Sequence, residues 1–138
     1  MEPPIGRHLH WVARIVQKAF NDVLEQAGGS LPVWHILLSV RVKDFNTQHE
    51  LAQAIGIEGP TLTHHLDAME HDGLVIRRRD PGNRRAIRVE LTPEGVQLFE
   101  TLRDVARRFD QQLRRGMTGD QVDMVRDSLT MMAENVRD

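Results

Sequence analysis

Residues 51–66 read LAQAIGIEGPTLTHHL, and their spacing predicts two short helices joined by a tight turn. Ala52 is small enough to let a second helix cross close to the first. Gly56, four residues later, can adopt the positive φ that a tight turn between helices needs. Leu62, six residues further on, supplies an apolar side chain that fills the angle between the helices. These three residue types at these offsets are typical of a helix-turn-helix.

Helix signals bound this motif on both sides. Thr47 and Glu50 predict a capping box at the start of the first helix, in which Thr47 is the N-cap and Glu50 bonds back to it. The second helix is expected from about Gly59 to His71, with Gly73 as the residue that ends it. Its exposed face carries short polar groups able to reach base edges and phosphates, namely Thr61, Thr63, His64, His65 and Asp67. The same pattern also fits a helical hairpin that does not contact DNA.

A basic hairpin follows directly. Residues 75–79 and 86–91 predict two strands, and Asp80-Pro81-Gly82-Asn83 between them has strong turn chemistry. In the second strand, alternation places Ile87, Val89 and Leu91 on one face and Arg88 and Glu90 on the other. A helix-turn-helix followed by a basic two-stranded hairpin predicts a winged helix that binds double-stranded DNA.

The charge is distributed unevenly along the chain. Residues 77–88 hold six arginines and one aspartate, a net charge of +5, whereas residues 1–76 and 89–138 carry −4 and −3. The formal total of −2 for the 138 residues therefore hides one concentrated basic segment. An acidic body repels DNA everywhere except at the basic hairpin and the adjoining helix, which favours one docking orientation.

Amphipathic helices flank this core on both sides. Apolar side chains recur in steps of three and four over residues 5–27, 92–115 and 118–136. Pro32 fits the first turn of a further helix, to about Val42, at the start of the core. The chain therefore predicts one domain, residues 1–138, of mainly α (α+β) class with a small β-hairpin wing. We expect a winged-helix core at about residues 32–91 and dimerisation helices at about residues 1–30 and 93–138. Packing of these helices inside a monomer is the alternative.

Composition excludes several classes of protein. The chain has no cysteine, so disulfides, zinc thiolate sites and a cysteine nucleophile are ruled out. No run approaches about 18 apolar residues, and the first residues lack the pattern of a secretory signal, so we expect a cytoplasmic protein with no membrane partner. No Ser/His/Asp constellation or phosphate-binding glycine loop is recognisable, so neither an enzyme nor a cofactor is expected.

Residues 49–95, HELAQAIGIEGPTLTHHLDAMEHDGLVIRRRDPGNRRAIRVELTPEG, carry a family resemblance. With residue 48 they resemble the core of the MarR/SlyA family of bacterial transcriptional regulators, most specifically in the wing. There the family usually has Asp-Pro-x-Asp-Arg-Arg, and this chain has residues 80–85, DPGNRR. The flanking helices also lie where that family has its dimerisation elements.

The resemblance implies a homodimeric repressor of a pseudo-palindromic operator. The helix from Gly59 would enter the major groove and Arg84 the minor groove, with Asp80 paired to Arg84 to preset its direction. The residues expected to contact DNA are Gly59, Pro60, Thr61, Thr63, His64, His65, Arg77, Arg79, Asp80, Arg84 and Arg85.

Two residues depart from the family pattern. Asn83 replaces the usual acid, which makes the hairpin more basic and removes one partner for the neighbouring arginines. His64 stands where many relatives have arginine, and a neutral histidine cannot make the bidentate guanine contact of arginine. Because histidine gains its charge close to neutral pH, His64 or His65 could make DNA affinity rise as the pH falls.

The resemblance also implies a small-molecule effector, of the aromatic or phenolic acid kind, that lodges between the dimerisation helices and the winged domain and releases the repressor. Arg14 could pair with the carboxylate of such an acid. The alternatives are core packing for the two tryptophans and an ion pair to a neighbouring acid for Arg14. The candidate lining residues are His10, Trp11, Arg14, Trp34, His35 and Leu38.

Two other functions stay open at the level of sequence. A metal-responsive regulator could use His8, His10 and His35, but residues two positions apart on a helix point to different faces, so no metal site is expected. An effector-independent architectural winged helix could use the hairpin for contacts with a protein partner.

Overall fold

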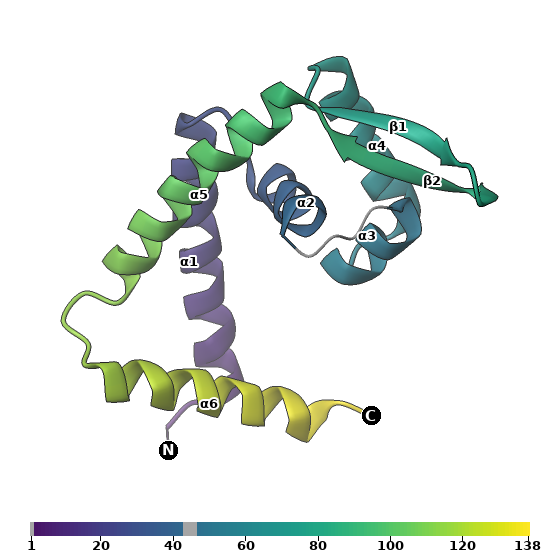
Figure 1. Cartoon of the computed structure of the whole chain (residues 1–138). Helices are drawn as coiled ribbons and strands as arrows, with labels where there is room; N and C mark the ends of the chain where they lie inside the picture. Colours follow the sequence, from purple (N-terminus) through teal and green to yellow (C-terminus); the bar gives the residue numbers. More distant parts are fainter. Residues whose placement is uncertain (1, 43–46) are drawn as a thin grey trace. The chain divides into compact units, whose positions relative to one another are not determined.

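The computed structural model describes residues 2–42 and 47–138, and over these ranges the chain forms six helices and one two-stranded hairpin (Figure 1). In chain order the elements are α1 (Ile5–Gln26), α2 (Leu31–Arg41), α3 (Gln48–Ile55), α4 (Gly59–His71), β1 (Val75–Asp80), β2 (Asn83–Leu91), α5 (Pro93–Leu113) and α6 (Gly119–Val136). This confirms the predicted fold class. The chain divides into two compact units, residues 1–106 and 107–138.

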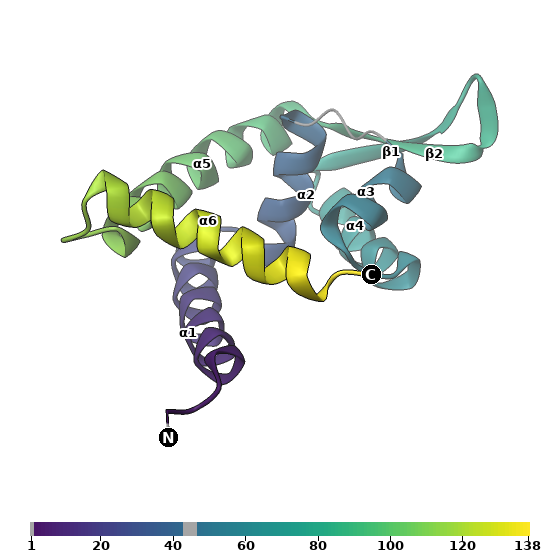
Figure 2. The same cartoon turned by 90° about the horizontal axis from the view of Figure 1, so that it is seen from below.

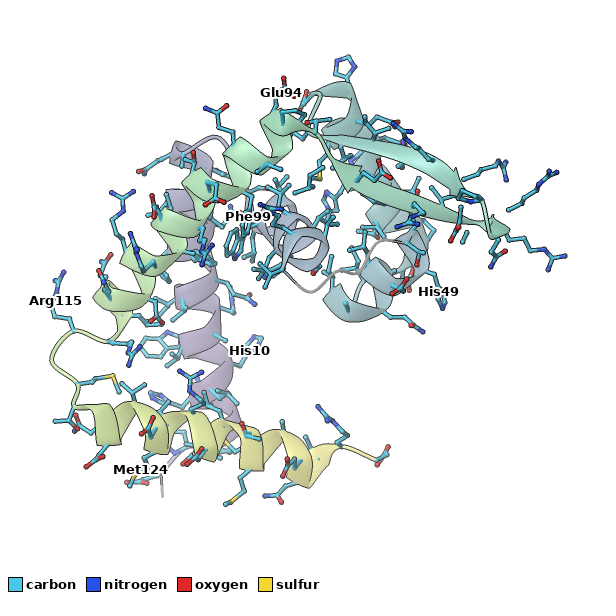
Figure 3. All side chains as sticks on the ribbon, in the orientation of Figure 1. His10, His49, Glu94, Phe99, Arg115 and Met124 are labelled. Carbon is cyan, nitrogen blue, oxygen red and sulfur yellow. The ribbon has the colours of Figure 1, made fainter. Side chains whose placement is uncertain are left out.

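One hydrophobic core holds the elements of the first unit together. Trp34 of α2 stacks on Phe99 of α5, with ring centroids 5.7 Å apart and planes 10° from parallel, and Figure 3 shows Phe99 pointing toward α2. The helix-turn-helix and the hairpin share this core, so they are fixed to the helices around them. Its buried side chains are Leu24, Trp34, Ile36, Leu37, Leu51, Leu62, Leu66, Met69, Val75, Val89, Phe99 and Leu102.

Most helix starts follow their predicted caps. At α5, the hydroxyl of Thr92 accepts a hydrogen bond of 3.0 Å from the backbone N–H of Gly95, and at α6 Thr118 and Gln121 form the predicted capping box. Thr47 caps α3, accepting from the N–H of Glu50 at 3.2 Å.

The capping box predicted at Thr47 and Glu50 is wrong in one of its two bonds, the one from Glu50 back to Thr47. The carboxylate of Glu50 accepts from the hydroxyl of Thr47, at 2.9 Å, and not from its backbone N–H. The extended backbone of Thr47 is instead engaged with Arg88, where it forms an isolated antiparallel bridge. The first turn of α3 is therefore capped and also attached to the hairpin.

The hairpin is longer than predicted. β1 and β2 pair antiparallel, with Val75 opposite Leu91 and an irregularity between Arg79 and Asp80. β2 begins at residue 83 rather than 86, because backbone pairing continues to the tip, where both faces meet water and no apolar alternation marks the strand. Figure 2 shows this hairpin projecting past α3 and α4.

Alternation along β2 is only partly as predicted. Val89 is buried, as expected of its face, but Arg88 of the opposite face is half-buried rather than exposed. The physical reason is the bridge with Thr47, which brings another segment of chain along this edge of β2.

Two helices carry apolar side chains that are open to solvent in the single chain. In the unit of residues 107–138, α6 has no buried residue and exposes Met124, Val125, Leu129, Met131 and Val136. In the other unit, α1 exposes Ile5, Leu9, Trp11, Val12 and Ile15. Within the described ranges, no helix has both the length and the apolar character needed to cross a membrane.

Candidate nucleic-acid interface

The helix-turn-helix has the geometry that its spacing predicts. Gly56 ends α3 with φ of 80°, a left-handed conformation that glycine adopts at little cost. Leu62 is 1% exposed and belongs to the core, with Ala52 packed against it. The side-chain amide of Gln48 lies 3.5 Å from the hydroxyl of Thr63, a further link between α3 and α4. The motif therefore presents α4 at a defined angle.

The outward face of α4 carries most of the polar side chains expected to contact DNA. Gly59, Pro60, Thr61 and His64 are exposed, whereas Thr63 and His65 are half-buried. The rings of His64 and His65 lie 5.9 Å apart in a tilted arrangement. Gly59 and Pro60 open the helix, so its first turn is bare of bulky side chains, and a DNA backbone or base edge can approach it closely.

The tip of the hairpin is ordered by its own polar groups. Arg79, Arg84 and Arg85 are all exposed, and the guanidinium of Arg79 donates a hydrogen bond of 2.9 Å to the backbone carbonyl of Arg84. The carboxylate of Asp80 accepts from the backbone N–H of Gly82 at 2.9 Å. In the part of the chain that the structure describes, no ion pair joins Asp80 to Arg84, so the predicted pairing of these residues is corrected to a turn contact.

Arg77 differs from the other arginines of the hairpin. Its Nη2 lies 2.6 Å from Asp67 Oδ1 and 2.9 Å from Glu70 Oε2, both on α4. Its backbone N–H donates a further bond of 3.1 Å to Glu70 Oε1. Asp67 and Glu70 are three residues apart and share one side of the helix.

Electrostatics keeps this cluster of Arg77, Asp67 and Glu70 charged. Hydrogen bonds from the side chain and backbone of Arg77 lower the pKa of Glu70. Partial burial opposes the charge of Arg77, but its bonds to Glu70 and Asp67 outweigh this and raise its pKa. Arg77 was expected only as a DNA contact, and no role was expected for Glu70. Two features of the sequence could have predicted this contact. Asp67 and Glu70 are three residues apart on α4, and Arg77 is two residues after buried Val75 and so lies on the same face of the strand.

The residues proposed to line an effector site are not brought together as one cluster. Trp34 is buried against Phe99, which is the packing alternative considered for it. His35 is half-buried, and burial lowers its pKa. His10 is exposed and projects outward from α1 (Figure 3), and Leu38 is half-buried beside the core.

Two members of that set line one groove. Trp11 and Arg14 of α1 face Leu31 and Pro32 of α2 across an open groove with a volume of about 700 Å³. Trp11 is 59% exposed. Within residues 2–42 and 47–138, no three histidine, aspartate or glutamate side chains gather closely enough to hold a metal ion.

The fold and this site define a winged helix-turn-helix protein. Residues 30–87 match the model of the MarR family. The chain is also similar to the crystal structure of a mutant MarR from E. coli complexed with operator DNA, at 25% identity over 94% of this chain and 93% of that one, with a TM-score of 0.85.

Two other solved structures share the fold. The S. aureus MepR–DNA complex is 22% identical over 99% of this chain and 100% of that chain, with a TM-score of 0.86. The organohalide-sensing transcriptional regulator RdhR in its 2,4-dichlorophenol-bound form is 20% identical over 96% and 79%, with a TM-score of 0.83. Residues 30–87 thus match the MarR family model, and the chain has the winged-helix fold of the MarR-family structures that it resembles.

Proposed function

We propose that this chain is a sequence-specific DNA-binding transcription regulator, and that it acts as a homodimeric repressor of a pseudo-palindromic operator. One observation carries the proposal. The open polar face of α4 and the exposed wing arginines Arg79, Arg84 and Arg85 belong to the same compact unit. The E. coli MarR structure that this chain resembles was determined with operator DNA, which supports the same function.

Each part of the interface has a distinct task in this proposal. The residues of α4 from Gly59 to His65 read base edges and phosphates in the major groove, and Arg84 and Arg85 enter the adjacent minor groove. Arg79 contributes by bonding the backbone of Arg84. Asp80 shapes the turn through its hydrogen bond with Gly82. Because His64 stands where many relatives in the family have arginine, we expect the operator to lack the guanine that such an arginine would contact.

The apolar faces of α1 and α6 support a dimer. Side chains such as Ile5, Leu9, Val125 and Leu129 are between about two-fifths and two-thirds exposed in the single chain, and burying them would be favourable. In this proposal residues 1–30 and 93–138 form the dimer, and residues 32–91 form the DNA-binding core. Two-fold symmetry then places the two α4 helices about 34 Å apart, one turn of DNA.

A small aromatic or phenolic acid is the proposed effector. The groove beside Trp11 offers an exposed indole, and Arg14 at its edge offers a cation for a carboxylate. RdhR, which shares the fold, was determined with 2,4-dichlorophenol bound. Quenching of tryptophan fluorescence by an aromatic acid such as salicylate, lost in Arg14→Ala, supports this site. Quenching that persists in that variant removes Arg14 from it.

The experiment that tests the function is selection of binding sites from a random-sequence DNA pool. We expect enrichment of a pseudo-palindrome with half-sites about one helical turn apart, bound in the presence of excess non-specific competitor. Sedimentation should give a dimer at micromolar concentration. Selection that enriches no sequence would overturn the proposal of a sequence-specific regulator. A stable monomer in sedimentation would overturn the proposal of a homodimer.

A further inference from the structure

We propose that Arg77 is a positioning residue of the DNA interface: held by Asp67 and Glu70 of α4, it sets the orientation of the wing relative to the recognition helix. The inference rests on the proposed function, because it concerns how α4 and the wing reach one DNA duplex together. It assigns Arg77 a role different from that of Arg84 and Arg85, which are proposed to contact DNA directly.

The contacts with α4 hold the backbone of β1 as well as the side chain of Arg77. Arg77 Nη2 bonds both acids, at 2.6 Å to Asp67 and 2.9 Å to Glu70. Glu70 uses its second oxygen to accept the backbone N–H of Arg77 at 3.1 Å. Charged hydrogen bonds of this kind are stronger than neutral ones. The side chain and the backbone of one β1 residue are thus both tied to one helix.

Burial separates Arg77 from its neighbour in the strand. The side chain of Arg77 is 19% exposed, whereas that of Arg78, which faces the opposite side of the hairpin, is 63% exposed. Among the described residues, Arg78 has a longer contact, of 3.7 Å, to Glu90. The two Nη2 hydrogens of Arg77 are already taken by Asp67 and Glu70, so this nitrogen has none left for a phosphate.

The hairpin is attached at both of its edges. On the β1 edge, Glu70 takes the place of a neighbouring strand by accepting the N–H of Arg77. On the β2 edge, the backbone of Thr47, just before α3, pairs with Arg88. Each edge is therefore joined to one helix of the helix-turn-helix, and Figure 1 shows the hairpin lying beside both. Breaking the Glu70 attachment would leave the wing held on its other edge and by Val75 and Val89 in the core.

Because Glu70 is charged, the direction in which its substitution changes DNA affinity tests the proposal. Glu70 and Asp67 are negative groups on the helix proposed to face DNA, so removing the charge of Glu70 should tighten binding if only long-range repulsion matters. If Glu70 acts by holding Arg77, the same change should weaken binding. The two roles therefore predict opposite effects of one substitution.

The test uses the full chain and a duplex that the wild-type protein selects from a random pool. Dissociation constants are measured over a series of KCl concentrations for wild type, Arg77→Gln and Glu70→Gln, with Arg78→Gln as the control matched in charge and strand. Arg77→Gln is also made together with Arg84→Ala and Arg85→Ala, which remove the two wing-tip cations proposed to enter the minor groove. Arg77→Lys is included as the variant that keeps the charge. Thermal unfolding of every variant identifies any that is merely unfolded.

We expect Arg77→Gln and Glu70→Gln each to weaken binding about tenfold, the scale of one charged hydrogen bond. The salt slope should fall in both variants, because a displaced wing tip loses its contacts to DNA, although Glu70→Gln removes no cation. In the background of Arg84→Ala and Arg85→Ala, Arg77→Gln should cost less than about twofold more, since the wing tip it places no longer contributes. Arg78→Gln should leave the preference for the selected duplex over a scrambled one unchanged.

Three results would overturn the positioning role while leaving the proposed function intact. The first is tighter binding by Glu70→Gln. The second is a salt slope that falls in Arg77→Gln but stays at the wild-type value in Glu70→Gln. The third is an Arg77→Gln loss of the same factor in the background of Arg84→Ala and Arg85→Ala as in the wild-type chain. A wild-type chain that enriches no sequence would instead overturn the proposed function, and this inference with it.

Discussion

Arg79 Nη1 donates a hydrogen bond of 2.9 Å to the backbone carbonyl of Arg84, across the tip of the hairpin. This bond orders the backbone that carries Arg84 and Arg85, and it occupies only part of the Arg79 guanidinium, which has five N–H donors. The tip therefore presents its cations on a preformed backbone, which reduces the ordering that binding would otherwise require.

The first prediction concerns these tip cations. Arg84→Gln and Arg85→Gln should each lower the slope of log affinity against log salt by about 1, because each removes one cation that displaces counterions. Titration of the selected duplex at several KCl concentrations measures the slope. Slopes equal to the wild-type value in both variants would mean that the hairpin tip does not contact DNA.

The second prediction concerns the stacked pair Trp34 and Phe99. Phe99→Ala should lower the free energy of unfolding by about 3–5 kcal/mol, because it removes a fully buried ring and leaves a cavity. Urea denaturation at fixed protein concentration measures this loss. Ile76→Ala, which shortens a side chain that is 40% exposed, is the control and should cost under about 1 kcal/mol. Similar losses in the two variants would contradict the assignment of this pair to the core.

The third prediction concerns Gly95, in the first turn of α5. A Cβ at this position would collide with the backbone carbonyl of Leu74, so Gly95→Ala should destabilise the chain although alanine has the higher helix propensity. Gly119→Ala, in the first turn of α6, is the matched control because a Cβ there meets open space. Thermal unfolding compares the two variants. A midpoint for Gly95→Ala at or above that of wild type would show that the approach to Leu74 is not tight.

The fourth prediction concerns pH and His35. Burial lowers the pKa of His35 below its ordinary value of 6.5, so the unfolded chain binds a proton at a higher pH than the folded chain does. Its stabilising contribution is therefore complete above about pH 6.5 and is lost as the pH falls through the lowered pKa. The melting temperature should drop between pH 7.5 and 5.5, and His35→Gln should reduce this drop. An equal reduction by His71→Gln, on the exposed end of α4, would assign the effect elsewhere.

The fifth prediction concerns the histidines of α4. Histidine gains a positive charge as the pH falls from 8 to 6, so DNA affinity should rise over this range if His64 or His65 lies against phosphates or base edges. His64 is exposed and His65 is half-buried, so His64→Gln should remove more of the rise. Affinity that does not change between pH 8 and pH 6 would discard the hypothesis.

Local patterns accounted for most of the fold. Gly56 at the turn, Gly73 after α4, and the caps at Thr92 and Thr118 were all predicted from neighbouring residues and are confirmed. These features depend on backbone conformations and hydrogen bonds within one helical turn, so a short window of sequence contains their cause. Two predicted side-chain bonds were wrong although both partners lie within four residues: Glu50 bonds the hydroxyl of Thr47, and Asp80 accepts from Gly82 rather than pairing with Arg84.

The residues alone were enough to establish helix periodicity, cap chemistry and the concentration of arginine in residues 77–88, because each depends on positions close together in the chain. They could not establish which arginines are free. Arg77 and Arg78 are adjacent and chemically identical, yet β1 turns one toward Asp67, ten residues earlier, and the other toward solvent. That difference arises only when α4 packs against the hairpin, since the packing decides which face of the strand meets the acids.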